Sequence, residues 1–158
     1  MYAGYFELYK YNGNTWDSMG IPEANGEKLR VCDILETADG KIYIGTMSPN
    51  IFGGTGIWEH RAGKWVKISG GISDKPFGVS YFNYERSSFI TCLLEDKNGN
   101  IYAGTDGGVW KYNGGESWSC ISTSLPSSSN YIASLTEGVD GNIYDCRQLY
   151  KGWRHLEI

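Results

Sequence analysis

The sequence predicts an all-β protein, a β-propeller built from four copies of one four-stranded repeat. Three segments, 31–46, 90–105 and 132–147, align without gaps, and each is rich in β-favouring residues on both sides of an Asp-Gly or Asn-Gly pair. Equivalent positions at residues 1, 42, 101 and 143 are separated by 41, 59 and 42 residues. A period near 42 with several short strands per repeat is typical of propeller blades.

Each repeat reads as four consecutive antiparallel strands, named A to D. In the second repeat we expect strand A over 31–38, strand B over 41–46, strand C around Trp58 and strand D from Trp65. The pairs Asp39-Gly40, Asn98-Gly99 and Asp140-Gly141 are predicted to form tight two-residue turns between strands A and B. The chain divides into blade 1 (1–27), blade 2 (28–72), blade 3 (73–128) and blade 4 (129–158).

Aromatic residues recur at equivalent positions of the repeats, and a shared position indicates a shared packing role between blades. They form three groups: Tyr2, Tyr43, Tyr102 and Tyr144; Tyr9, Trp58, Trp110 and Tyr150; Trp16, Trp65, Trp118 and Trp153. The alternative interpretation of the tryptophans is a set of sugar-stacking platforms. Glu36, Glu95 and Glu137 also recur, near the end of strand A. We expect these glutamates to cap hairpins or face solvent, and the alternative is a ring of carboxylates that binds a cation.

The first repeat starts at strand B, so the first blade is expected to lack its innermost strand. Three arrangements follow: a four-bladed monomer with one three-stranded blade, an eight-bladed ring of two chains, or part of a longer parent. We rank the four-bladed monomer and the eight-bladed ring equally, and the part of a longer parent below them. An unpaired strand edge beside an open blade is prone to association, which modestly favours a homodimer through the incomplete first blade.

Composition excludes several classes of protein. The net charge of -4 argues against a nucleic-acid partner, because binding to phosphates needs a basic face. No apolar run is long enough to cross a membrane and no signal peptide is present, so a cytoplasmic location is the default expectation. The cysteines, Cys32, Cys92, Cys120 and Cys146, lack metal-ligand spacing and are interpreted as small buried residues. No cofactor and no metal site is expected.

Two long connections mark the face on which a ligand would bind. The loop 47–55 joins strands B and C of the second repeat, and 71–88 leads into strand A of the third, so both belong to the same face of a propeller. Long loops on a rigid scaffold commonly carry function. The alternative is that they pack on blades 2 and 3 or fill a subunit contact. The candidate ligand-binding residues are Phe52, Phe77, Tyr81, Phe82, Asn83, Tyr84 and Arg86.

The stretch 94–118 resembles the sensor propeller repeat of two-component regulators, with its pattern L-x-E-D-x-x-G-x-I/L-W/Y-x-G-T-x-x-G-G. Residues 111–118 are also similar to the Asp-box of bacterial neuraminidase repeats, S-x-D-x-G-x-T-W, with Lys111 in place of its Ser and Asn113 in place of its Asp. Both resemblances imply a propeller fold over nearly the whole chain. Neither implies an activity, because the Asp-box is a structural element of a hairpin.

The sequence favours a binding module over an enzyme. A sialidase-like site would need several arginines around a carboxylate, but Arg61 and Arg154 fall on or beside the outer strands. His60 and His155 occupy strand positions where a lyase or metal site is not expected, and no nucleophile–base pair can be assembled. We therefore expect a non-catalytic module that binds a glycan, a small molecule, a peptide or a protein. The alternatives are a structural or oligomerisation scaffold without a small ligand and, ranked below it, a sialidase-like or lyase-like enzyme.

Overall fold

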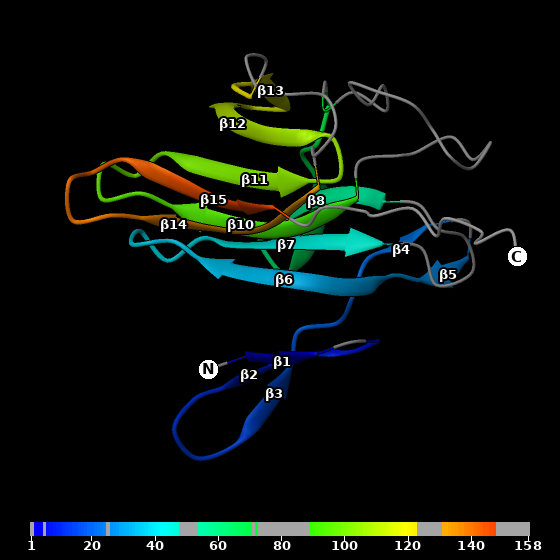
Figure 1. Ribbon diagram of the computed structural model, residues 1–158. Coiled ribbons are helices and arrows are strands. Elements are labelled where there is room, and N and C mark those ends of the chain that lie inside the picture. The colour runs from blue at the N-terminus through cyan, green and yellow to red at the C-terminus, as the bar shows by residue number, and fades with distance from the viewer. Residues whose placement is uncertain are drawn as a thin grey trace, which may run out of the picture.

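A computed structural model describes residues 2–4, 6–24, 26–47, 54–70, 72, 89–122 and 131–147 of the chain. Every regular element in these residues is a β-strand, and the sheets are stacked one on the next along the chain (Figure 1). The all-β propeller architecture predicted from the repeats is therefore confirmed. In the part of the chain that the structure describes, no helix is long and apolar enough to span a membrane.

The first sheet has three strands in the order β1-β2-β3, as expected for a blade without strand A. Its strands are β1 (Tyr2–Gly4), β2 (Leu8–Tyr11) and β3 (Trp16–Ser18). A short ribbon that the repeat pattern does not predict, β4 (Glu23–Ala24) with β5 (Glu27–Lys28), follows this sheet.

The second and third sheets are four-stranded and antiparallel, with neighbours in chain order. The second consists of β6 (Arg30–Glu36), β7 (Ile42–Met47), β8 (Gly54–Arg61) and β9 (Lys64–Lys67). The third consists of β10 (Ile90–Glu95), β11 (Ile101–Thr105), β12 (Gly108–Gly114) and β13 (Ser117–Cys120). Strand β8 begins at Gly54, so the loop before it ends two residues earlier than the predicted 47–55 segment.

The fourth sheet pairs β14 (Ile132–Glu137) with β15 (Ile143–Arg147), the predicted strands A and B of blade 4. The predicted strands around Tyr150 and Trp153 lie outside the described residues. An irregularity in strand A also recurs. In β6, β10 and β14 the pairing with strand B shifts register directly after the first residue of the aligned segment, which is Val31, Ile90 or Ile132.

The turns between strands A and B differ from the predicted two-residue type. Each is a five-residue connection in which the glycine N–H bonds to the carbonyl three residues earlier, as Gly40 does with Thr37 at 2.8 Å and Gly99 with Asp96 at 2.9 Å. Only the glycine has a positive φ, +81° for Gly40 and +77° for Gly99, whereas a primed two-residue turn of the Asp-Gly type needs two. At the first turn position, the Asp96 carboxylate accepts the N–H groups of Asn98 and Asn100 at 2.9 and 2.8 Å, which favours the wider turn.

The core lies between the blades, where each sheet packs on the next. Between blades 1 and 2, Leu8, Val31 and Ile44 form a buried cluster. Between blades 2 and 3, Tyr43 packs in a cluster that includes Trp110 and Trp118. The third cluster joins blade 3 to blade 4 through three buried residues, Tyr102, Val109 and Ile132. The predicted inter-blade packing role is confirmed for these aromatic residues, although Trp16 at the end of the stack is 46% exposed.

One glycine of strand B allows each following blade to approach. A Cβ on Gly45 would lie 2.5 Å from Cγ2 of Ile90, the residue that opens strand A of blade 3. A Cβ on Gly104 would lie 2.8 Å from Cγ2 of Ile132, the matching residue of blade 4. These distances are far below a normal carbon–carbon contact, so close packing of the blades requires glycine at this position.

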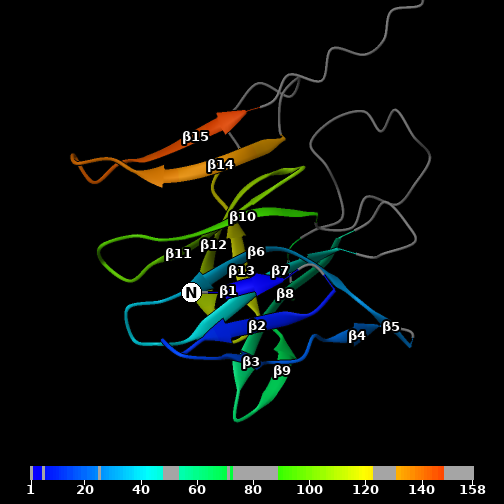
Figure 2. The ribbon, with the colours of Figure 1, turned by 90° about the horizontal axis from the view of Figure 1, so that it is seen from below.

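The four sheets form an open stack rather than a closed ring in the described part of the chain. Blade 1 (β1–β3) lies at one end and blade 4 (β14–β15) at the other, with blades 2 and 3 between them, as Figures 1 and 2 show. Each end sheet therefore presents one broad face that no other described blade covers.

Candidate functional site

The two predicted long loops begin and end at one end of the sheets. Met47 closes β7 and pairs with Arg30 at the start of β6, while Ile90 opens β10 and pairs with Thr105. Because β6 and β10 are equivalent strands, the loop after Met47 and the segment before Phe89 start from the same edge of the stack (Figure 1). We call this edge the loop face, and the opposite edge with the strand A–B turns the turn face.

The seven predicted ligand residues lie outside the described part of the chain, and the prediction that they bind a ligand stands untested. They are Phe52, Phe77, Tyr81, Phe82, Asn83, Tyr84 and Arg86. What the structure describes is the base from which these loops start.

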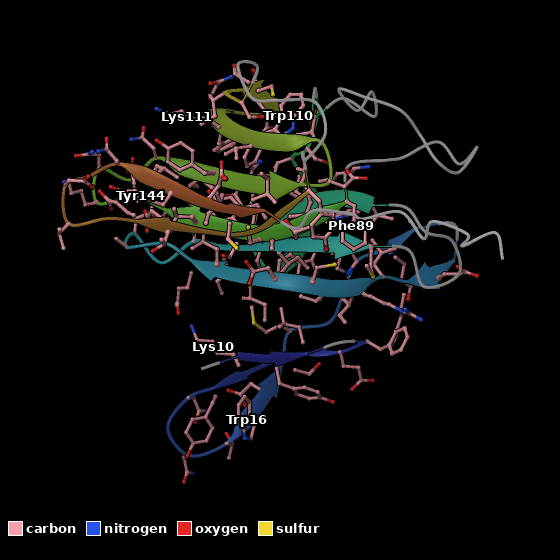
Figure 3. The ribbon with its side chains drawn as sticks, viewed as in Figure 1. Lys10, Trp16, Phe89, Trp110, Lys111 and Tyr144 are labelled. Atoms are coloured by element: carbon pink, nitrogen blue, oxygen red, sulfur yellow. The ribbon has the colours of Figure 1, made fainter. Side chains whose placement is uncertain are left out.

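One group of side chains at this base was missed by the repeat argument. Arg30, Phe89 and Tyr131 occupy equivalent positions, each directly before the apolar residue that opens the aligned strand-A segment. The rings of Phe89 and Tyr131 come from blades 3 and 4 and are 6.5 Å apart. Arg30 of blade 2 places its guanidinium 5.3 Å from the ring centre of Phe6 in blade 1. Figure 3 labels Phe89 at the loop-face end of the sheets.

A signal for this group is present in the sequence. The residue that follows is apolar in each of the three repeats (Val31, Ile90 and Ile132), but the position itself is Arg, Phe or Tyr. A packing role would favour one kind of side chain, so this variation indicates a position free to take another role. Two aromatic rings and a guanidinium offer stacking and hydrogen-bond donation, the combination that suits a sugar ring or a peptide.

A hydrogen-bond network makes the base of the first loop rigid. The Thr46 side chain is fully buried, and its hydroxyl accepts the indole N–H of Trp58 at 3.0 Å. The same hydroxyl lies 3.0 Å from the carbonyl of Gly56 and 2.6 Å from the hydroxyl of Thr55. Thr105 is the equivalent residue of blade 3, and its hydroxyl donates to the carbonyl of Gly108 at 2.9 Å. The loop face therefore rests on well-ordered strand ends.

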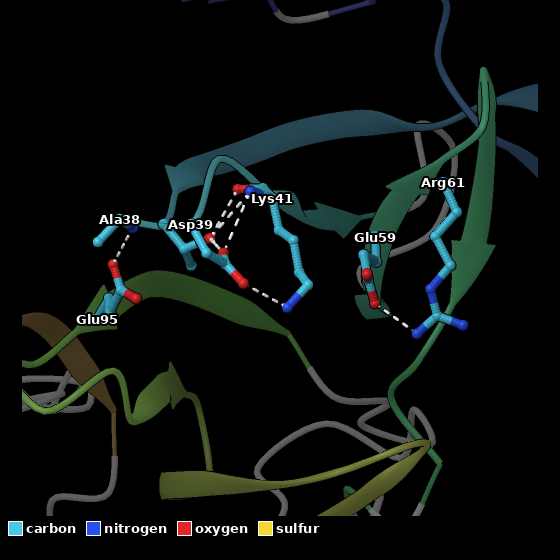
Figure 4. Close-up of polar contacts among 7 residues, drawn as sticks. Ala38, Asp39, Lys41, Glu59, Arg61 and Glu95 are labelled. Atoms are coloured by element: carbon cyan, nitrogen blue, oxygen red, sulfur yellow. Dashed lines mark hydrogen bonds and ion pairs between the residues drawn. The ribbon is translucent and has the colours of Figure 1, made fainter.

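The turn face carries a polar cluster between blades 2 and 3, which Figure 4 shows in part. Glu59 is only 5% exposed and pairs with Arg61 at 2.5 Å, while Asp39 pairs with Lys41 across the strand A–B turn. The Lys41 ammonium and the Thr37 hydroxyl lower the pKa of Asp39 to about 2. Burial and then the charge of Glu59 raise the pKa of the Tyr43 and Tyr112 hydroxyls. Each of these two carboxylates therefore has a cationic partner within its own blade.

The recurring glutamates join neighbouring blades. Oε2 of Glu95 in blade 3 accepts the main-chain N–H of Ala38 in blade 2, and Oε2 of Glu137 in blade 4 accepts that of Lys97 in blade 3, both at 2.7 Å. They cap hairpins, as expected, but hairpins of the preceding blade. Glu36 instead forms an exposed ion pair with Lys10 at 3.4 Å. Among the described residues, no group of three or more His, Cys, Asp or Glu side chains could hold a metal ion.

A second kind of hydrogen bond joins neighbouring blades, and here the acceptor belongs to the earlier blade. Oδ2 of Asp33 in blade 2 accepts the N–H of Leu93 in blade 3 at 2.6 Å, and Oδ1 accepts the N–H of Ile34 at 2.9 Å. Burial raises the pKa of Asp33, although these two N–H groups oppose the increase. The Cys92 thiol takes the same position in blade 3 and bonds to the main chain of Leu135 in blade 4. Neighbouring strands A are therefore fixed to each other in both directions.

These features define a propeller segment with a rigid base for loops on one face. Residues 84–107 match the family model described as "Two component regulator propeller". Two solved structures, both extracellular domains of BT4673 from B. thetaiotaomicron, align with 92% and 91% of this chain at TM-scores of 0.65 and 0.61 and 21% identity. One is described as part of a one-component system and the other as part of a hybrid two-component system. The comparison with curated proteins gave no match.

The resemblance to two-component-regulator propeller repeats is thus confirmed, while no comparison bears on the neuraminidase repeat. At 21% identity the two structures establish the propeller fold of this chain. The chain spans only 18% of the length of each of these structures.

Proposed function

We propose that this chain is a non-catalytic ligand-binding segment of a signal-receiving propeller, with its ligand held at the loop face. The observation that carries the proposal is the position of Arg30, Phe89 and Tyr131 on the face from which both long loops start. These side chains differ from blade to blade, whereas the residue after each of them is apolar in all three repeats. Aromatic and guanidinium groups on a rigid base suit a glycan, a peptide or another small molecule with both apolar and polar surfaces.

The family match and the two structural relatives support a sensing role over catalysis. The matched repeat is named after two-component regulators, and the relatives are extracellular domains. We include in the proposal that this chain works outside the cytoplasm, in place of the default cytoplasmic location. The turn-face carboxylates Asp39 and Glu59 are paired with cations, which leaves them poorly suited to act as a general acid or base.

The test is ligand binding to the chain, screened by thermal shift against neutral oligosaccharides and short peptides and then measured by calorimetry. Phe89→Ala, Tyr131→Ala and Tyr81→Ala should each weaken binding roughly fivefold, because each removes a stacking contact of about 1 kcal/mol. Val139→Ala is the matched control, since Val139 is fully exposed on the turn face. Binding that survives all three loop-face substitutions would contradict the placement of the site.

The second candidate function is a scaffold that assembles without a small ligand. The uncovered faces of the two end sheets favour it specifically, because such faces are ready to join another blade. A screen in which no oligosaccharide or peptide binds, together with a stable oligomer in solution, would favour the scaffold.

A further inference from the structure

Four side chains of successive blades follow one another along the loop face. They are Phe6 of blade 1, Arg30 of blade 2, Phe89 of blade 3 and Tyr131 of blade 4, and we call them the loop-face row. The Arg30 guanidinium lies 5.3 Å from the ring centre of Phe6, and the rings of Phe89 and Tyr131 are 6.5 Å apart. Phe6 is 43% exposed, and the other three side chains are partly exposed. The row is therefore accessible from water.

The chemistry of the row favours apolar groups of a ligand over sugar hydroxyls. Phe6 and Phe89 have no polar side-chain atom, so their rings neither donate nor accept a conventional hydrogen bond. A sugar ring carries hydroxyls around its edge, and each hydroxyl that loses water without gaining a partner costs free energy. Aliphatic and aromatic side chains of a peptide carry no such cost when they are covered. The row therefore suits a peptide with apolar side chains better than a neutral glycan.

The charges of the loop face differ between blades 2 and 3. Arg30 opens β6 in blade 2, and its guanidinium has the planar geometry that binds a carboxylate through two parallel hydrogen bonds. Asp106 lies between β11 and β12 in blade 3, and its main-chain N–H bonds to the carbonyl of Phe89 at 3.3 Å. A negative charge at Asp106 disfavours a second carboxylate beside Phe89. We therefore expect a carboxylate of the ligand over blade 2 and apolar groups over blades 3 and 4.

The arrangement of the row indicates an elongated ligand. Arg30, Phe89 and Tyr131 occupy equivalent positions on blades 2, 3 and 4, which are stacked in this order (Figure 1). Packed sheets lie about 10 Å apart, so two such spacings separate blade 2 from blade 4 by roughly 20 Å. An extended peptide spans about 3.3 Å per residue, so about six residues cover this distance. A single sugar or amino acid is too short to contact all three positions.

We propose that the loop face binds an extended peptide of about six residues, with a carboxylate on Arg30 and apolar side chains on Phe89 and Tyr131. The inference rests on the proposed function, because it names the class of ligand that the same face holds. Burial of apolar side chains and one charge-assisted ion pair supply the affinity. The opposite charges of Arg30 and Asp106 fix the direction in which the peptide lies.

Affinity selection from a library of N-acetylated hexapeptides of random sequence, read by mass spectrometry, tests the class of ligand. Enriched peptides should combine aromatic or aliphatic side chains with an acidic side chain or a free C-terminal carboxylate. The most enriched peptide is then synthesised in two forms, one with this carboxylate and one with an amide in its place. In calorimetry the wild type should bind the amide at least about tenfold more weakly, because hydrogen bonds between charged groups are the strong ones.

Variants of the row locate the peptide on the protein, each confirmed as folded by circular dichroism. Arg30→Leu should bind the carboxylate and amide forms equally, whereas Arg30→Lys should retain part of the preference for the carboxylate. Phe6→Ser should weaken binding about fivefold, because it removes an apolar contact beside Arg30.

Ile121→Ser is the matched control for Phe6→Ser. Ile121 is exposed to a similar degree, 47%, and lies at the same face. It follows β13, which is three strand spacings of about 4.8 Å from β10, so it lies away from the row. The affinity for the peptide should therefore stay at the value of the wild type.

Neutral oligosaccharides are screened in parallel, so that a failure of this inference differs from a failure of the proposed function. If an oligosaccharide binds in a way that depends on Phe89 and no peptide is enriched, the peptide inference is wrong and the ligand site stands. If neither class binds, both are wrong. Peptide binding that Arg30→Leu and Phe6→Ser leave unchanged would place the peptide on another surface and would also overturn the inference.

Discussion

Oε2 of Glu95 lies 2.7 Å from the main-chain nitrogen of Ala38, which joins the end of strand A in blade 3 to the strand A–B turn of blade 2. The bond is charge-assisted, which makes it stronger than a hydrogen bond between two neutral groups. Glu137 makes the same bond to Lys97 one blade further on. Glu36 has the same place in its blade but faces blade 1, where it forms only an exposed ion pair with Lys10.

We predict that Glu95→Ala lowers the free energy of unfolding by about 1–3 kcal/mol, the contribution of a hydrogen bond to a charged group. Glu36→Ala is the matched control and should change it by less than about 1 kcal/mol, because exposed ion pairs contribute little. Thermal and urea unfolding of the two variants provide the comparison. Equal losses at both positions would mean that the bond between Glu95 and Ala38 adds nothing to the blade junction.

A methyl group at Gly45 should separate blades 2 and 3. Gly45→Ala places a Cβ 2.5 Å from Cγ2 of Ile90, and such overpacking typically costs about 1–3 kcal/mol. Because the clash is specific to Ile90, Ile90→Ala should be less destabilising in the Gly45→Ala background than in the wild type. A double-mutant cycle by urea unfolding measures this coupling. Additive effects would show that the glycine has another role.

The repeat pattern was sufficient to predict the four sheets, because Asp-Gly and Asn-Gly pairs between β-favouring segments mark hairpins directly in the sequence. The pattern also identified Glu95 as a recurring residue. It did not identify the partner of Glu95, because the partner is a main-chain N–H of another blade, at Ala38, and any residue type supplies one. Likewise Tyr102 and Tyr144 occupy the same position of the repeat, but one is buried and the other half exposed. Among the described residues, only Tyr102 has a following blade packed on it.

The candidate site shows which residues a repeat pattern cannot identify. Recurrence singles out residues with a shared structural role, so it passed over Arg30, Phe89 and Tyr131, whose side chains differ between the blades. The ribbon of β4 and β5 was also missed, because two-residue strands such as Glu23–Ala24 are too short to show alternation.

Thr46→Val should destabilise the base of the first long loop. Valine has nearly the shape of threonine, but the change leaves the indole N–H of Trp58 and the carbonyl of Gly56 without their partner in a buried site. We expect a loss of about 1–3 kcal/mol in the free energy of unfolding. Thr15→Val on the exposed hairpin of blade 1 is the control and should cost less. Similar losses for both variants, by thermal unfolding, would contradict the role of the Thr46 network.

The acid stability of the protein should depend on Asp96. Burial alone would raise its pKa, but hydrogen bonds from Asn100, Asn98 and Tyr102 outweigh it and lower the pKa below the ordinary value of 3.8. The folded protein therefore binds this proton less tightly than the unfolded chain. Asp96 accordingly contributes stability that is present above pH 3.8 and is lost as the pH falls through its lowered value.

Replacing Asp96 by Asn should reduce the slope of the melting temperature against pH between about pH 5 and pH 2. Asp33→Asn should have the opposite effect. Burial raises the pKa of Asp33, so ionisation of this side chain lowers the stability of the folded protein as the pH rises above 3.8. Without this group, the stability should fall more steeply as the pH is lowered. Calorimetric scans over this range compare the three proteins. If Asp96→Asn keeps the slope of the wild type, the hydrogen bonds in this turn do not hold the carboxylate in its charged form.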